Sequence, residues 1–351
     1  MSDMGTHRPP PLDEAAADEA RRRQRVLTKP AGSLGRLEEL SITLAGITGS
    51  TRPALREPAV FVLAGDHGVA EEGVSAYPSE VTAQMVLNFL RGGAAINVLA
   101  RLHGARVVVA DLGVAADLPP HPDLRDRKIR RGAGNIARGP AMTVEEAAAA
   151  VAAGRALVAQ EAGQGLDVVC TGDMGIANTT PSAALICHFT GLDPERVVGR
   201  GTGVDDAGLD RKRAAVRRAL EVNRAALNSG DPLAALAAIG GLEIAGLAGV
   251  IIEGASRRLP VVIDGFISGA AALSAAALEP RCVPYLIAAH RSQELGHRAA
   301  LEGLGLRPLL DLDLRLGEGT GAVLALPLLD AAVALLDEMA TFDDAGVSDR
   351  Q

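Results

Sequence analysis

One carboxylate, Glu318, stands between two glycines where a long apolar stretch of the chain begins. Glycine leaves room for a ligand or another backbone to approach closely. Apolar surroundings remove water from a carboxylate and raise its pKa, which makes a general base that works near neutral pH. The alternative is structural, because a glutamate in the first turn of a helix is favoured by the helix dipole. This segment alone leaves both interpretations open.

A second candidate segment, residues 175–182, precedes a helical stretch and contains several hydroxyl side chains. Thr180 suits an N-cap position and Pro181 the first helical position. The free N–H groups at the beginning of a helix bind anions, so the segment is a candidate phosphate site. Capping alone explains the same residues. The segment is not a Walker loop, since no Gly-Lys-Ser/Thr follows it.

A third segment, residues 199–204, is rich in glycine and leads into a basic helical stretch that contains Lys212. Its spacing does not match the dinucleotide-binding fingerprint. A glycine turn followed by a lysine one or two helical turns later is able to hold a phosphate, and a solvated basic helix face explains the lysine equally well. Tyr77 precedes a predicted helix that begins near Ser79, and it is either a cover for an aromatic ligand or a surface anchor.

Metal-ligating patterns are weak in this sequence. His290 and His297 are seven residues apart, which is too far along a helix for shared ligation, and no His-Glu-x-x-His motif occurs. The only Asp-Asp pair near these segments, Asp205 and Asp206, follows a glycine loop, whereas magnesium-assisted binding of a diphosphate sugar uses such a pair after a β-strand. We therefore expect neither a metal nor a cofactor.

The elements that position these residues follow from the apolar pattern. Short apolar stretches without polar alternation predict strands buried on both faces, at residues 59–64, 105–110, 166–170, 196–198, 259–263 and 283–287. Alanine-rich helical patterns separate them, at residues 81–102, 144–162, 181–189, 209–228, 245–257 and 269–278. Alternating strands and helices predict an α/β fold with a Rossmann-like parallel sheet flanked by helices.

Polar residues follow at least five of the six predicted strands, where glycine occurs with Asp, His or Ser. In an open parallel sheet, ligands bind outside the carboxyl ends of the strands. Tight turns between a strand and a helix also use glycine and aspartate, which explains each loop singly. The repetition along one edge favours a shared small-molecule site.

Composition excludes several other classes of protein. A net charge of -8, no Trp and two Tyr argue against a nucleic-acid partner. The chain shows neither an uninterrupted apolar stretch long enough to span a membrane nor a signal-peptide core. Its three cysteines are widely spaced in apolar surroundings, which predicts reduced thiols. We expect a soluble, cytoplasmic protein with no membrane partner.

The domain organisation is predicted from the same pattern. Residues 1–12 are expected to be disordered, because they are polar and rich in proline. Residues 13–55 contain two helical stretches, and with residues 331–351 they are expected to form a small helical domain from the two chain ends. Residues 56–330 are expected to form a large α/β catalytic domain.

Seven segments taken in order resemble one family, the nicotinate-nucleotide–dimethylbenzimidazole phosphoribosyltransferases of cobalamin assembly. They are residues 29–35, 65–75, 134–142, 172–181, 264–266, 284–287 and 315–321. Each segment is modest, but the ordered set is specific and spans most of the chain. The resemblance implies transfer of 5-phosphoribosyl from nicotinate mononucleotide to 5,6-dimethylbenzimidazole. The products are α-ribazole 5′-phosphate and nicotinate.

The resemblance also assigns residues. Glu318 occupies the Leu-Gly-Glu-Gly motif that supplies the family's catalytic base. The implied phosphate and ribose ligands are Gly175, Asn178, Thr179, Thr180, Gly201, Lys212 and Ser292. The implied base-binding residues are Tyr77, Ser79, Met85, Asp173 and Met174. The family often has Glu where Asp173 stands and varies near Tyr77, so the identity of the accepting azole stays open.

The resemblance further implies the two-domain fold described above and a homodimer. Two rival functions fit the residues without it. One is a nucleotide hydrolase or nucleosidase of the same fold, in which Glu318 activates water. The other is a non-catalytic nucleotide sensor, although a sensor has no need of a base beside its ligand.

Overall fold

A six-stranded parallel sheet forms the centre of the computed structural model, which describes residues 8–201 and 203–348. Its strands are β1 (Pro58–Gly65), β2 (Arg106–Gly113), β3 (Leu124–Asp126), β4 (Val168–Met174), β5 (Val261–Ile263) and β6 (Leu286–Ala288). The order β3-β2-β1-β4-β5-β6 is that of a doubly wound Rossmann-type sheet, in which the strand order reverses between β1 and β4. The predicted α/β class and parallel sheet are confirmed.

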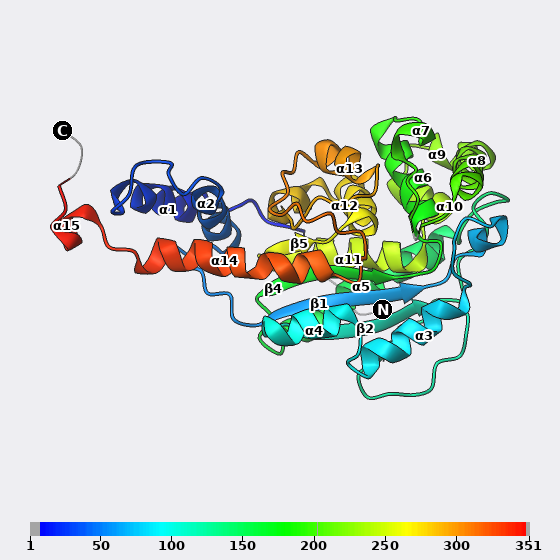
Figure 1. Cartoon of the computed structure of the whole chain (residues 1–351), viewed down its shortest axis with the longest axis horizontal. Coiled ribbons are helices and arrows are strands. Elements are labelled where there is room, and N and C mark those ends of the chain that lie inside the picture. Colours follow the sequence, from blue (N-terminus) through cyan, green and yellow to red (C-terminus); the bar gives the residue numbers. More distant parts are fainter. Residues whose placement is uncertain (1–7, 202, 349–351) are drawn as a thin grey trace.

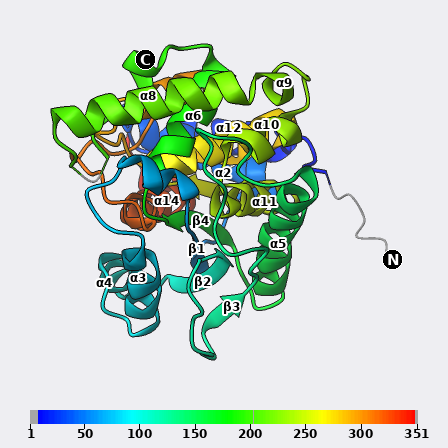
Figure 2. The same cartoon turned by 90° about the vertical axis from the view of Figure 1, so that its right-hand side faces the viewer.

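Alternate side chains of β1 serve two separate cores, because helices cover both faces of the sheet (Figure 1, Figure 2). Phe61 and Leu63 face the layer that contains α5 (Val144–Ala162), α6 (Thr179–Thr190), α11 (Leu242–Ser256) and α12 (Phe266–Leu278). Val60 and Val62 face the layer that contains α3 (Glu80–Leu90), α4 (Ala95–Leu102) and the first half of α14 (Thr320–Glu338). This double burial explains why the strand has no polar alternation.

The N-terminal helices and the C-terminal part of the chain pack together at one side of the molecule (Figure 1). There α1 (Glu14–Val26) and α2 (Arg36–Thr48) contact the second half of α14, and α15 (Phe342–Ala345) follows. Arg23 Nη2 donates a hydrogen bond of 2.8 Å to the carbonyl of Asp337. Because α14 runs unbroken from the sheet to this cluster, the predicted boundary at residue 331 falls within a helix. The division into domains stays a prediction.

Residues 8–12 of the segment predicted to be disordered lie against the α/β part, whereas residues 1–7 lie outside the described part of the chain. The Tyr285 hydroxyl donates to the Pro10 carbonyl at 2.8 Å. Arg258 Nη2 donates to the Pro11 carbonyl at 3.0 Å.

Several predicted elements need correction. The strand predicted at residues 196–198 is wrong, because Pro194–Val197 forms a short helix, α7, that begins with proline after Asp193. The sheet instead gains β3, whose sequence Leu-Arg-Asp carries no strand signal. The helix predicted at residues 81–102 divides at Gly92, which has φ +75°. Four further helices differ from the prediction or were missed: α8 (Asp206–Val222), α9 (Arg224–Leu227), α10 (Pro232–Ile239) and α13 (His297–Leu304). The 3-10 turns are η1 (Gly68–Glu72) and η2 (Pro280–Tyr285).

Among the described residues, α14 is the one helix long and apolar enough to cross a membrane by length and composition. Asp330 lies within this helix, so α14 is not the uninterrupted apolar stretch whose absence was expected. Val323, Leu329 and Leu336 of α14 are buried against the sheet and the N-terminal helices. The apolar composition of α14 is therefore explained by its place in the core.

Candidate active site

A cavity of about 360 Å³ opens at the carboxyl ends of β4, β5 and β6. Its walls are formed by the loops after these strands, the segment before α14, α3 with the loop before it, and Gly201. Ten of the predicted site residues line it: Tyr77, Met85, Asp173, Met174, Gly175, Asn178, Thr179, Gly201, Ser292 and Glu318. The structure thus brings together residues that are up to 241 positions apart in the sequence.

Three predicted site residues do not line this cavity. Ser79 lines a neighbouring surface cavity together with Asp66 and His67. Thr180 is fully buried within α6. Lys212 extends from α8 behind the wall, where its Nζ donates to the Thr179 hydroxyl at 2.9 Å, so it acts on the cavity at short range without lining it.

Glu318 lies immediately before α14 in the left-handed conformation, with φ +63°. A non-glycine residue in this conformation costs about 1–3 kcal/mol, and the surrounding structure must impose it. Gly317 and Gly319 also have positive φ. A side chain on Gly172 of β4 would overlap the Glu318 carbonyl, and one on Gly319 would overlap Val60. The glycines therefore let the two backbones pack closely, and Glu318 is not in the first turn of the helix.

The Glu318 carboxylate is removed from water, since the residue is 6% exposed. Burial raises the pKa of the Glu318 carboxyl, the Ile96 N–H lowers it and the negative charge of Asp264 raises it further. The Ile96 N–H, at the beginning of α4, donates to Glu318 Oε2 at 3.3 Å. The net direction is upward, as a general base requires.

Asp264, which follows β5, caps α14 from a distant part of the chain. Its Oδ1 accepts from the Ala322 N–H at 3.0 Å, and its Oδ2 accepts from the Gly319 N–H at 3.3 Å. The N-cap residue of α14, Gly319, has no side chain with which to do this. His290 Nε2 lies 3.6 Å from Asp264 Oδ1. Sequence reasoning assigned Asp264 and His290 no role, although both follow predicted strands.

Asp173 faces the same space from the end of β4. Burial raises the pKa of the Asp173 carboxyl well above its usual range, and the charges of Asp264, Glu243 and Glu318 raise it further. Asn178 Nδ2 donates to Asp173 Oδ1 at 3.0 Å. Asn178 is also the N-cap residue of α6, so the prediction that Thr180 caps this helix is wrong.

The wall at Gly201, which we call the cationic wall, has two positive side chains beside it, Arg315 and Lys212. Lys212 is 1% exposed, and burial lowers its pKa to about 8 although the charge of Glu294 raises it. Arg315 Nη1 donates to the Gly201 carbonyl at 3.2 Å. Glu294 and Arg315 line the cavity and were missed by sequence reasoning, which followed glycines and hydroxyls.

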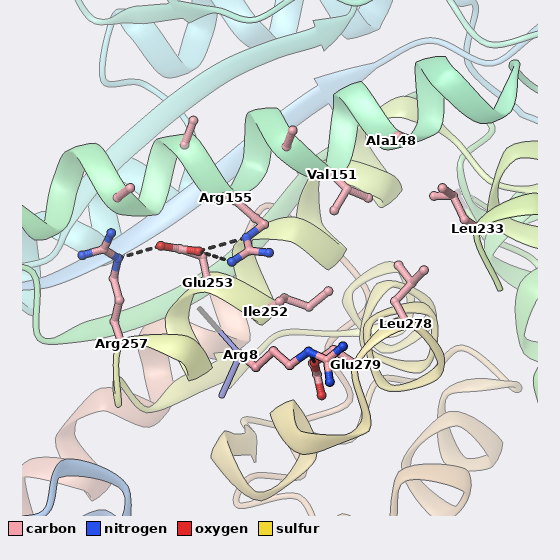
Figure 3. Close-up of a pocket in the computed structure, with 13 residues that line it drawn as sticks. Arg8, Ala148, Val151, Arg155, Leu233, Ile252, Glu253, Arg257, Leu278 and Glu279 are labelled. Atoms are coloured by element: carbon pink, nitrogen blue, oxygen red, sulfur yellow. Dashed lines mark hydrogen bonds and ion pairs between the residues drawn. The ribbon is translucent and has the colours of Figure 1, made fainter. Parts of the chain in front are cut away.

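A larger cavity of about 540 Å³ lies between α5 and the C-terminal ends of α11 and α12 (Figure 3). Its polar groups are engaged with one another: Glu253 Oε2 accepts from Arg155 Nε at 2.9 Å, and its Oε1 accepts from Arg257 Nε at 2.9 Å. The remaining lining is mainly apolar, as at Val151 and Ile252. Glu279 is likewise paired, with Arg8 at 3.8 Å, and none of the predicted site residues lines this cavity, so we do not take it as the candidate active site.

Within residues 8–201 and 203–348, no group of three or more His, Cys, Asp or Glu side chains is arranged to hold a metal ion. That the protein needs no metal stays a prediction.

The doubly wound sheet and the buried carboxylate in the cavity at its carboxyl edge are typical of an α/β enzyme. A family model described as "Phosphoribosyltransferase" matches residues 9–347, and the chain belongs to that family. A nicotinate-nucleotide–dimethylbenzimidazole phosphoribosyltransferase from Chloroflexus aurantiacus is 61% identical over 340 residues, which is 97% of this chain and 96% of the relative. One from Desulforudis audaxviator is 57% identical over 338 residues, or 96% of this chain and 95% of the relative.

A solved structure shows the same fold. The crystal structure of the enzyme with this name from Thermus thermophilus has a TM-score of 0.92 and 52% sequence identity, and the match covers 97% of this chain and all of that chain. The resemblance seen in the sequence is confirmed.

Proposed function

We propose that this protein transfers 5-phosphoribosyl from nicotinate mononucleotide to 5,6-dimethylbenzimidazole or a related azole. The products are α-ribazole 5′-phosphate, an intermediate of cobalamin biosynthesis, and nicotinate. The names of the similar proteins support this substrate pair. The observation that carries it is the geometry of Glu318, a carboxylate held in a strained conformation, removed from water and facing a cavity with a cationic wall.

The reaction needs one proton acceptor. One azole nitrogen attacks the anomeric carbon with its lone pair, and the bond from that carbon to the pyridinium nitrogen breaks. Its electron pair neutralises the pyridinium and releases nicotinate. The ionised Glu318 accepts the proton from the other azole nitrogen, so the ribosylated product leaves uncharged at the ring. A single displacement inverts the β configuration of the donor to α.

The cavity walls suggest where each substrate lies. We assign the phosphate and ribose to the wall formed by Gly175, Asn178, Thr179, Gly201 and Ser292, with Lys212 behind Thr179. We assign the azole to the side formed by Tyr77, Met85, Asp173 and Met174. Tyr77 is 56% exposed, so it is free to cover a bound ring. Ser79 and Thr180 fall outside this assignment, because neither lines the cavity.

The decisive experiment mixes the protein with nicotinate mononucleotide, with and without a panel of azoles, and identifies products by mass. We expect nicotinate to appear only with an azole, together with one equivalent of the ribosylated azole phosphate. Nicotinate released at the same rate without azole would show a hydrolase in which Glu318 activates water. Binding without consumption would show a sensor.

Two further properties belong to this proposal. We propose a homodimer, tested by the mass of the protein in sedimentation equilibrium. We propose a cytoplasmic location, tested by fractionation of the cells that produce it.

A further inference from the structure

The cationic wall of the cavity contains a carboxylate, Glu294, that has no role in the reaction above. It lines the cavity and is 8% exposed. Its backbone N–H donates to the Ser292 hydroxyl at 3.3 Å. A carboxylate beside a phosphate subsite opposes binding, because like charges held close together away from water repel.

The groups that stabilise the Glu294 carboxylate are those assigned to phosphate. Burial raises the pKa of the Glu294 carboxyl, whereas the Lys212 ammonium, the Gly201 N–H and the Arg315 guanidinium lower it. Gly201 and Lys212 are the proposed phosphate ligands on this wall. The carboxylate therefore uses the same donor and the same positive field that a phosphate group would use.

The glycine loop before α8 packs closely against two charged side chains, Glu294 and Lys212. A side chain on Gly199 would overlap Glu294 Oε2, and a Cβ on Gly201 would lie 2.6 Å from Lys212 Nζ. Among the described residues, Glu294 Oε2 has no hydrogen-bond partner. A buried carboxylate oxygen without a hydrogen-bond partner is held less firmly than a bonded one, so an incoming anion is able to displace the carboxylate.

We propose that Glu294 is an internal anion that competes with the phosphate group of ligands for Gly201 and Lys212. The identity of the ligand rests on the proposed function, but the competition does not. Free phosphate must displace the carboxylate without any other contact. A mononucleotide also contacts the cavity through its ribose and base, and these contacts offset the displacement. Glu294 thereby lowers the affinity for every ligand that places a phosphate group here, including the phosphorylated product, and free phosphate is held most weakly because it makes no other contact.

Calorimetric titration with inorganic phosphate tests this role without any turnover. We expect Glu294→Gln to bind phosphate tighter than the unmodified protein by about tenfold or more, the scale of removing a close like charge. A merely structural role for Glu294 predicts the opposite sign. Glu302→Gln is the matched control, since it removes one negative charge from the exposed face of α13, and it should leave phosphate affinity unchanged. Adding Lys212→Met to Glu294→Gln should abolish the gain.

Equal or weaker phosphate affinity in a folded Glu294→Gln variant overturns the proposal. If that variant does not fold, Glu294→Asp decides, because it withdraws the carboxylate from Gly201 by one methylene and retains the charge. Tighter phosphate binding by Glu294→Asp supports the competition, and unchanged or weaker binding refutes it. The outcome is separate from the proposed function: tighter phosphate binding without conversion of nicotinate mononucleotide upholds the internal anion and overturns the phosphoribosyl transfer.

Discussion

Glu318 combines a strained backbone conformation with the carboxylate that we propose as the catalytic base. Its left-handed backbone costs about 1–3 kcal/mol, and the packing of Gly172 and Gly319 around it imposes that conformation. This conformation directs the side chain away from the axis of α14, so that its carboxylate accepts a hydrogen bond from the Ile96 N–H at the beginning of α4. The same backbone turn therefore buries the carboxylate and orients it.

At this scale the first prediction concerns Glu318→Gln. Glutamine keeps the shape of the side chain and is able to accept from Ile96, but it takes no proton from the azole. We expect a folded protein whose kcat falls by ~10² or more, the scale of losing a general base, with little change in the binding of nicotinate mononucleotide. Rates come from nicotinate release. Glu338→Gln, at the exposed far end of α14, is the matched control and should keep full activity.

The second prediction concerns pH. Because burial and the charge of Asp264 raise the pKa of Glu318, the base becomes protonated at a higher pH than an ordinary glutamate. We expect kcat to fall on the acid side with a midpoint above the ordinary glutamate value, and to rise toward a plateau as pH increases. A steady-state pH profile with saturating azole measures this midpoint. An acid limb at or below the ordinary value would contradict the assigned base.

At the scale of elements, α14 depends on a cap supplied by another loop. Asp264 accepts hydrogen bonds from the first turn of a helix that begins with glycine and so cannot cap itself. The same carboxylate contributes the negative charge that raises the pKa of Glu318. The loop after β5 therefore fixes both the position and the basicity of the residue before α14.

The third prediction follows from that double role. Asp264→Asn keeps one acceptor oxygen but removes the charge, so the pKa of Glu318 should fall and the acid limb of kcat should move to lower pH. Loss of the charged cap should also lower stability by roughly 1–2 kcal/mol, read from thermal unfolding. Asp343→Asn in the exposed α15 removes the same charge far from the cavity and should change neither. An acid limb that does not move would show that the charge of Asp264 does not raise the pKa of Glu318.

Sequence reasoning succeeded where local signals and tertiary structure agree. The strand β1 is buried along its whole length and β2 and β4 along most of theirs, and all three show apolar stretches followed by polar loops. It failed where tertiary contacts decide, since β3 is a polar edge segment that pairs with β2 through its backbone. It also missed Asp264 and Glu294, because capping at a distance and burial of a charge depend on neighbours far away in the sequence.

At the scale of the whole molecule, four carboxyl groups gather near the cavity: Asp173 and Glu318 line it, and the buried Asp264 and Glu243 lie outside its lining. Asp173, Glu243, Asp264 and Glu318 approach from four different elements, and each of the other three raises the pKa of Asp173. Like charges held close together oppose folding whenever they ionise together. The fold tolerates this repulsion because the sheet and two helical layers bury a large apolar core on both faces.

The fourth prediction uses Asp173→Asn to measure how much the repulsion between these carboxylates destabilises the fold. An acid whose pKa is raised on folding contributes stability that is present below its unfolded pKa and is lost as pH rises through its folded pKa. Asparagine does not ionise, and its amide oxygen is able to keep the hydrogen bond from Asn178. We expect the melting temperature of the variant to exceed that of the unmodified protein by a margin that grows from pH 4 to pH 8.

Calorimetry at several pH values, with the exposed Asp117→Asn as control, gives the margin. A constant or shrinking margin would show that the pKa of Asp173 is not raised on folding, because only a raised pKa makes the unfolded protein lose the proton first. A growing margin would show that the acidic cavity is maintained at the expense of stability, as expected where a functional site opposes the fold that holds it.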